Sequence, residues 1–285
     1  MASAAMGGVG APSPKELFSM RRLLLPALAA MLFATSSLCA ADPKPIKALL
    51  VLGGCCHDYK AQQEILKKGL EARAHVEVTI VYSADSSTKA TFEPYKKADW
   101  AKGYDVVIHD ECSADVKDAE TVGNILGAHK AGLPAVNLHC AMHSYRTGKG
   151  DWFEFIGIES TGHGPQVPIS ITFIDKEHPI TKGMADWKTV NEELYNNVKI
   201  LKTATSLARG SQELKNKTET TVVVWTNDYH GTRVFNTTLG HNNATVGDAR
   251  YLDLLAHGLL WATDKLNDTY LKPAVKEIPK KDASK

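Results

Sequence analysis

The chain has 285 residues, of which 44% are hydrophobic and 23% charged, and its formal net charge is +1. This length and composition allow a sizeable core in one or two domains. The balanced charge argues against nucleic acid as the main partner, because binding to phosphates requires clustered lysine and arginine.

The first segment, 1–41, is predicted to be an N-terminal extension with a signal peptide. Arg21 and Arg22 precede LLLPALAAMLFA, an apolar run that is too short to span a bilayer and has the length of a signal-peptide core. Cleavage after Ala41 would leave a mature chain without a membrane span. We therefore expect an exported protein, periplasmic or secreted. Met20 is an alternative start codon, and the choice stays open.

Strands and helices alternate in the next part of the chain. Continuous apolar runs and period-two patterns predict strands, and period-3.6 patterns predict helices. In chain order these are strand 46–54, helix 63–74, strand 75–83, strand 104–111, helix 115–132 and strand 133–139. The alternation predicts an α/β fold with a doubly wound, mostly parallel sheet.

The second half is more mixed. We expect a strand at 166–175, a hairpin formed by 220–227 and 232–240, and a final amphipathic helix at 248–266. A single domain is expected over 42–270. The remainder, 271–285, is rich in lysine and proline and is predicted to be disordered.

Titratable residues follow three of the predicted strands. They are Cys55, Cys56, His57 and Asp58 after the first strand, His109 to Cys112 after the third, and His139, Cys140 and His143 after the fourth. In an open parallel sheet, ligands bind outside the carboxyl ends of the strands. We therefore expect the functional site at that edge.

The stretch VNLHCAMHSYR offers two candidate residues for a sharp turn after a strand. Such a turn requires small or permissive residues two positions to either side. Around His139 these are Asn137 and Ala141, whereas around Cys140 they are the bulky Leu138 and Met142. The turn is thus predicted to present His139, and Cys140 is predicted to face inward.

Metal binding is a second interpretation of these histidines. His139 and His143 are four positions apart at a predicted helix start, which would place both rings on one face. The candidate ligands are His139, His143, His163 and His241, with zinc as the candidate divalent ion. The alternative is that these histidines bond to the backbone or to substrate.

Four cysteines remain after the predicted cleavage, and export would permit disulfides among them. Neighbouring Cys55 and Cys56 could bridge only under strain. A disulfide is therefore expected to join one of them to Cys112 or Cys140.

Six ordered motifs, from about residue 46 to residue 264, resemble the ThuA-like (trehalose utilisation) family. They are LLVLGG, VNLHCAMHS, TGHGPQVPISITFIDKEHPITKGM, NEELY, VVVWTNDYHGTRVFNTTLGHNN and LLAHGLLWATD. The resemblance implies a flavodoxin-like fold similar to class I glutamine amidotransferases. It also implies that His139 stands where amidotransferases carry their cysteine nucleophile. The sequence departs from the family at NLHCA, where glycines are more usual.

The resemblance and the strand-end positions together suggest roles for nine residues. The predicted catalytic residues are His139, His241 and Glu193, the acidic residue that directly precedes the Leu-Tyr pair. The predicted substrate-binding residues are His57, His109, His143, His163, Tyr195 and Asn242.

The family's link to trehalose and other glycosides implies a role in carbohydrate metabolism. We expect a sugar or a 3-keto sugar as substrate, the latter made by a partner sugar 3-dehydrogenase. The expected reaction is an isomerase, lyase or hydrolase reaction with histidine acid/base or metal-assisted chemistry. The alternative is a non-catalytic sugar-binding module that stacks sugars on Trp152, Tyr145 and Trp225. A third, less favoured hypothesis is an amidase that depends on Cys140.

Overall fold

The first apolar run forms β1 (Ile46–Gly54), which pairs in parallel with β2 (Val76–Ser83) and β3 (Val106–Cys112). The computed structural model describes residues 43–273. The predicted signal peptide, and residues 274–285 of the predicted tail, lie outside the described residues. Leu271, which was assigned to that tail, forms a β-bridge with Ala74.

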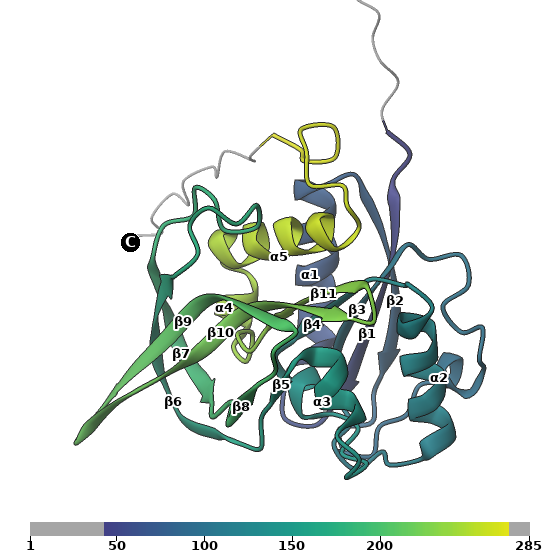
Figure 1. Cartoon of the computed structure of the whole chain (residues 1–285), viewed down its shortest axis with the longest axis horizontal. Helices are drawn as coiled ribbons and strands as arrows, with labels where there is room; N and C mark the ends of the chain where they lie inside the picture. Colours follow the sequence, from purple (N-terminus) through teal and green to yellow (C-terminus); the bar gives the residue numbers. More distant parts are fainter. Residues whose placement is uncertain (1–42, 274–285) are drawn as a thin grey trace, which may run out of the picture. The chain divides into compact units, whose positions relative to one another are not determined.

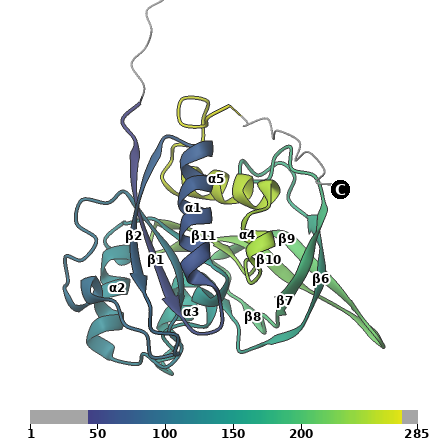
Figure 2. The same ribbon diagram turned by 180° about the vertical axis from the view of Figure 1, so that it is seen from behind.

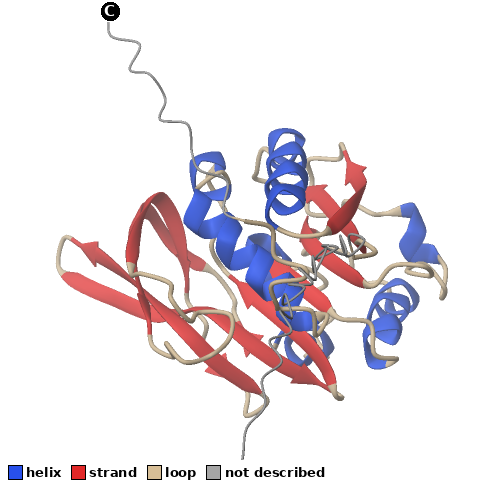
Figure 3. Cartoon of the chain, turned by 90° about the horizontal axis from the view of Figure 1, so that it is seen from above, coloured by secondary structure: helices blue, strands red, loops and turns tan. Residues whose placement is uncertain are grey.

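The main sheet has nine strands in the order β2-β1-β3-β4-β11-β10-β9-β6-β7 (Figure 1). The first five run parallel, and they include β4 (Ala135–Leu138) and β11 (Thr232–Thr237). The other strands are antiparallel: β10 (Lys217–Tyr229), β9 (Ala204–Leu214), β6 (His163–Phe173) and β7 (Trp187–Tyr195). Figure 3 shows long strands extending away from the helices. The predicted fold class is confirmed, with a parallel core and an antiparallel extension.

Helices cover both faces of the parallel part. Helices α1 (Tyr59–Arg73) and α5 (Ala249–Ala262) pack on one face and lie side by side in Figure 2. The other face carries α2 (Ala119–Lys130) and α3 (Asp151–Ile156). Side chains of β1 alternate between the two cores, with Leu50 and Leu52 toward α1 and Leu49 and Val51 on the other side.

Several short elements complete the described part of the chain. They are η1 (Glu93–Lys96), η2 (His139–His143), α4 (Asn243–Val246) and a two-stranded sheet of β5 (Ile158–Glu159) and β8 (Lys199–Ile200). Among residues 43–273, no helix has both the length and the apolar character needed to cross a membrane.

The predicted elements of the parallel half match the structure within a few residues. Helix α1 begins earlier than expected, at Tyr59, because the Asp58 carboxylate caps it by accepting a hydrogen bond from the Ala61 N–H. The predicted hairpin is β10 and β11. The sequence did not predict α3, β7 or β9, and NEELY lies on strand β7.

Candidate active site and metal-binding residues

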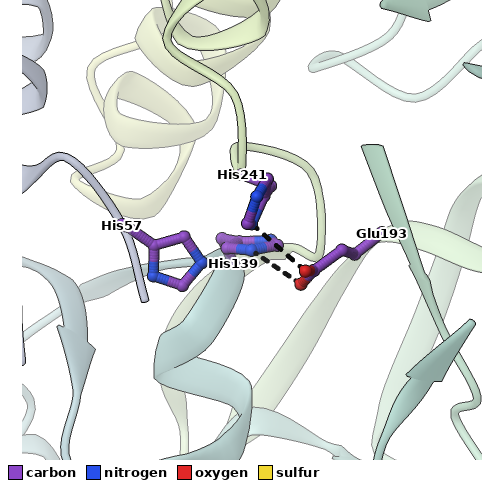
Figure 4. A group of neighbouring side chains, drawn as sticks. All are labelled: His57, His139, Glu193 and His241. Atoms are coloured by element: carbon purple, nitrogen blue, oxygen red, sulfur yellow. Dashed lines mark ion pairs between the residues drawn. The ribbon is translucent and has the colours of Figure 1, made fainter. Parts of the chain in front are cut away.

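Four side chains from separate segments converge at the carboxyl ends of the parallel strands (Figure 4). His57 lies in the turn between β1 and α1, His139 begins η2 directly after β4, and His241 lies between β11 and α4. Glu193 comes from β7. One ligand atom of each residue lies within 4.8 Å of the others, and we call these four residues the histidine–glutamate group.

His139 occupies the sharp turn that its sequence context predicts. Its φ is +39°, a left-handed conformation that is uncommon outside glycine. The Nδ1–H donates to the carbonyl of Thr238 over 2.7 Å, which fixes the orientation of the ring. That Nε2 lies 3.5 Å from both Glu193 Oε2 and the Tyr195 hydroxyl. The turn therefore aims the Nε2 of His139 at the carboxylate of Glu193.

The Nε2 of His57 also points into the histidine–glutamate group (Figure 4). Its Nδ1 lies 3.1 Å from the carbonyl of Cys55, to which Nδ1–H donates, and 3.0 Å from the Tyr59 hydroxyl. Its Nε2 is buried and has no hydrogen-bond partner. Burial, followed by the charges of His139 and His241, lowers the pKa of His57 to about 2. The ring is thus neutral at physiological pH, with a free lone pair in a confined space.

His241 is held by main-chain contacts on both sides. The Gln62 amide donates to the carbonyls of Gly240 and His241, at 3.3 and 3.2 Å. The buried Glu192 carboxylate accepts the N–H groups of His241 and Asn242, at 3.0 and 2.9 Å. Burial lowers the pKa of His241, although Glu193 acts in the opposite direction. The loop therefore holds the His241 ring beside those of His57 and His139.

Glu193 lies at the centre of the polar contacts. Its Oε1 is 3.3 Å from His241 Nδ1 and accepts a hydrogen bond of 3.1 Å from the Gln166 amide. Its Oε2 is 3.5 Å from His163 Nε2, at the exposed rim of the site. Burial acts to raise the pKa of Glu193, but the hydrogen bond and charge of His139, with His241 and His163, outweigh it and lower that pKa to about 2. The carboxylate is ionised at neutral pH.

The donor set suits a zinc-like ion. Three imidazoles and one carboxylate are common zinc ligands. Two buried ring nitrogens, His57 Nε2 and His241 Nδ1, make no hydrogen bond. The carbonyls of Cys55 and Thr238 fix the other nitrogens of His57 and His139, as outer hydrogen bonds do around metal-bound histidines. The residues present therefore fit a divalent cation.

The predicted metal ligands are only partly brought together. His139 and His241 belong to the group, and His57 and Glu193 replace His143 and His163 in it. His143 instead bonds to the Ser160 hydroxyl at 2.8 Å and stacks on Tyr195 with ring centroids 4.1 Å apart. The physical reason is that η2 is a 3₁₀ helix, where residues four apart point about 120° away from each other.

Two predicted substrate-binding side chains, those of His109 and Asn242, bond to residues outside the group. His109 is fully buried on the opposite face of the sheet, where it bonds to Glu111 at 2.9 Å and to His129 at 3.0 Å. The Asn242 side chain caps α4 by accepting the Ala244 N–H. Tyr195, by contrast, lies between His139 and His143. The structure therefore gives His109 no contact with the candidate site, contrary to our expectation.

The expected disulfide pairing is wrong. Cys55 bonds to its neighbour Cys56, and Cys112 bonds to Cys140. β3 and β4 are adjacent, so Cys112 and Cys140 come within 5.0 Å between Cα atoms, while Cys56 adopts a φ of +82° in the turn after β1. Cys140 is buried as expected, and its bond to Cys112 leaves no free thiol for the amidase reading.

The three aromatic residues of the sugar-stacking alternative are not accessible to a ligand. Trp152, Tyr145 and Trp225 are buried in the core on the α3 face, each no more than 2% exposed. They cannot offer a ring face to a sugar. The sequence did not single out Gln62, Gln166 or Tyr59 as site residues, and of the two glutamates in NEELY it favoured Glu193 over Glu192. Gln166 lies within the GHGPQ motif, whereas Gln62 has no signal beyond its place on an amphipathic helix.

Comparisons with known proteins agree with this fold. A search of curated proteins found no match. The crystal structure of a ThuA-like protein from Parabacteroides merdae ATCC 43184 has a TM-score of 0.61 at 21% identity, covering 82% of this chain and 94% of that one. A ThuA-like protein from Bacteroides uniformis ATCC 8492 gives 0.58 at 17% identity, covering 78% and 93%. A β-galactosidase from Rahnella sp. R3 gives 0.52 at 13% identity, covering 77% of this chain and 31% of that one.

At these identities the solved structures are similar in fold alone. The family comparison goes further, because the ThuA family, described as trehalose utilisation, matches residues 47–262, which is most of the chain. The protein therefore belongs to the ThuA family.

Proposed function

We propose that the protein is an exported, carbohydrate-active enzyme that transfers a proton beside the carbonyl of a sugar substrate, with a divalent cation held by the three imidazoles of the histidine–glutamate group. The observation that carries the proposal is the buried, unpartnered Nε2 of His57 amid two further imidazoles and an ionised carboxylate. The family's description as trehalose utilisation supports a sugar as the substrate class.

The proposed substrate is a keto sugar, such as a 3-keto glycoside supplied by a sugar 3-dehydrogenase. A carbonyl acidifies the neighbouring C–H, so an enzyme needs a base near that carbon and an electrophile near the oxygen. Isomerisation and elimination both begin with this proton transfer. Simple hydrolysis of an unoxidised glycoside would instead call for two carboxyl groups flanking the bond. Glu193 is the carboxylate that faces the three rings.

His57, His139 and His241 would hold the ion. A bound divalent cation supplies Lewis-acid polarisation of the carbonyl oxygen. Glu193, ionised and buried beside the rings, accepts the proton from carbon and returns it to the product. Gln166 orients Glu193 through its amide hydrogen bond, and the Tyr195 hydroxyl, 3.5 Å from His139 Nε2, offers a donor to a substrate oxygen.

The test starts with elemental analysis of the purified protein, followed by zinc titration of protein treated with a chelator. The substrates are trehalose, other glycosides and their 3-keto derivatives. We expect about one zinc per chain, turnover of a keto sugar, and loss of that turnover on chelation with recovery on adding zinc.

Three variants make this test more specific. His57→Ala should lose zinc binding and turnover, because it removes an inward-facing nitrogen. His143→Ala removes a neighbouring buried ring outside the group and should keep zinc binding. Equal zinc affinity in wild type and His57→Ala would disprove the metal assignment, and full turnover in His139→Ala would disprove the site itself.

A further inference from the structure

Four sulfur atoms lie directly beside the histidine–glutamate group, and the proposed reaction uses none of them. Cys55 and Cys56 immediately precede His57, and Cys140 immediately follows His139. With Cys112 they form two disulfides, Cys55–Cys56 and Cys112–Cys140. We call these residues the four-cysteine cluster.

The two disulfides are in contact with each other. Cys55 Sγ lies 3.4 Å from Cys112 Sγ. Exchange between disulfides requires a thiolate to reach the sulfur of another disulfide. Once the Cys55–Cys56 bond is opened with Cys55 as the leaving thiolate, that thiolate is already adjacent to its target. The structure therefore already places the sulfur that becomes the nucleophile, Cys55 Sγ, beside the sulfur that it attacks, Cys112 Sγ.

The solvent exposure of the four cysteines predicts the order in which they react. Cys56 is exposed and Cys55 is half-buried, while Cys112 and Cys140 are only 4% and 6% exposed. A reductant from solvent therefore meets Cys56 Sγ first, and attack there expels the Cys55 thiolate toward the interior. The buried disulfide is reached through Cys55 and not directly from solvent.

We propose that the four-cysteine cluster is a thiol–disulfide exchange site whose co-reactant is an external dithiol. One thiolate of the dithiol attacks Cys56 Sγ, forms a mixed disulfide and releases the Cys55 thiolate. The Cys55 thiolate attacks Cys112 Sγ, forming Cys55–Cys112 and breaking Cys112–Cys140, so that Cys140 leaves as a thiolate and takes up a proton.

The second thiol of the reductant then resolves the mixed disulfide at Cys56. The dithiol is oxidised to its cyclic disulfide. The protein gains two electrons and two protons as the thiols of Cys56 and Cys140, and it keeps one disulfide, Cys55–Cys112. All atoms and electrons are thus accounted for with one dithiol per chain.

The exchange changes the surroundings of two rings in the histidine–glutamate group. The carbonyl of Cys55 fixes the His57 ring, and Cys140 belongs to the same short helix, η2, as His139. The freed Cys140 sulfur lies with Cys112 and His57 in a set of donor atoms within 4.8 Å of one another. Reduction would therefore alter the binding of a cation, a consequence that rests on the proposed function, whereas the exchange itself does not.

The decisive experiment uses Cys56→Ser, which leaves Cys55 as the odd thiol. The folded protein, prepared without reductant, is quenched in acid, alkylated and mapped by peptide mass spectrometry. We expect a Cys55–Cys112 disulfide with Cys140 alkylated. Recovery of Cys112–Cys140 with Cys55 alkylated would overturn the proposal.

Cys55→Ser is the matched control, because it leaves the exposed Cys56 as the odd thiol. In this variant we expect Cys112–Cys140 to persist and Cys56 to be alkylated. If Cys56 instead formed a disulfide with Cys112 and freed Cys140 in this variant, the position of Cys55 would not direct the reaction. That result would also contradict the proposal.

Wild-type protein provides a test that does not depend on any variant folding. Treatment with an equimolar amount of dithiothreitol, followed by acid quench and alkylation, should give Cys55–Cys112 as the main remaining disulfide. Retention of Cys112–Cys140 with both Cys55 and Cys56 alkylated would refute the relay. The mapping needs neither zinc nor substrate, so its outcome is independent of the proposed enzymatic activity.

Discussion

Two adjacent glutamates on β7 perform different tasks because successive side chains of a strand point in opposite directions. Glu193 faces the three rings, and Glu192 accepts two main-chain N–H groups of the His241 loop. Glu193→Gln keeps the volume and removes the charge that accepts the proton. We expect turnover to fall by about 10²–10⁴-fold, with weaker zinc binding and little change in melting temperature. Steady-state kinetics, zinc titration and calorimetry measure the three quantities.

Glu192→Gln is the control for that substitution. Its amide offers one acceptor oxygen where the carboxylate offers two, and turns an NH₂ group toward a main-chain N–H. An unsatisfied buried group costs roughly 1–3 kcal/mol, so the free energy of unfolding should fall by about that amount. If Glu192→Gln left the stability unchanged and Glu193→Gln lowered it, the two assignments would be reversed.

At the scale of elements, the turn between β11 and α4 depends on Gly240. Its φ is +124°, and a Cβ built there would lie 2.7 Å from the Tyr251 hydroxyl and 3.5 Å from His139 Cβ. The Tyr251 hydroxyl itself donates to the carbonyl of Leu239 over 3.0 Å. Gly240→Ala should therefore destabilise the fold by about 1–3 kcal/mol and weaken zinc binding, as measured by chemical denaturation and titration.

Gly231→Ala is the control that separates the effect of backbone strain from the steric clash of residue 240 with Tyr251. Gly231 also has a positive φ, +86°, but a Cβ there would meet no atom within 4 Å. This variant should lose some stability and keep the zinc affinity of the wild type. An equal loss of zinc affinity in both variants would show that the contact of residue 240 with Tyr251 does not position the site.

The parallel half of the sheet could be predicted because its strands are buried on both faces and read as continuous apolar runs. β9 gave no such signal. Two of its buried positions are Gly210, where a Cβ would collide with Val223 and Ile169, and Gln212, whose amide donates to the carbonyls of Val167 and Glu192. At Gly210 the core space is filled by the side chains of neighbouring residues, and at Gln212 a buried amide satisfies its hydrogen bonds inside the protein. Neither position is hydrophobic in the sequence, so the alternating apolar pattern of a strand is missing.

The site was predictable to a similar degree. The sequence predicts His139 and His241 at the site because residues that follow parallel strands meet at one edge. It predicts His143 beside His139 only if the spacing is α-helical, and the 3₁₀ geometry of η2 separates the two rings. The role of Gln62 arises from a contact 178 residues away along the chain, with the carbonyl of Gly240. Local patterns do not encode such contacts.

At the scale of the whole molecule, three histidines from separate segments share one electrostatic property: His129 and His143, which are buried, and His57, which is half-buried. Burial is the largest cause that lowers the pKa of His57 to about 2 and the pKa values of His129 and His143 to about 3. His129 contacts His109 and the carbonyl of Leu133 on the α2 side, whereas His57 and His143 lie near the site. All three are neutral in the folded protein at pH 6.

This property predicts how stability depends on pH. In the unfolded chain each ring titrates near 6.5, so below that pH the unfolded state binds more protons than the folded state. Stability is therefore complete above pH 6.5 and declines as the pH falls toward the folded values of about 2 to 3. Near pH 6 the difference is about two protons, a slope of about 3 kcal/mol per pH unit.

Urea denaturation between pH 5.5 and 6.5, where most carboxylates stay ionised in both states, measures this slope. His143→Gln removes one of the three rings, and the slope should fall by about one third. A free energy of unfolding that does not change over this range would mean that these rings are protonated in the folded protein, and the neutral imidazoles assigned to the site would then be wrong.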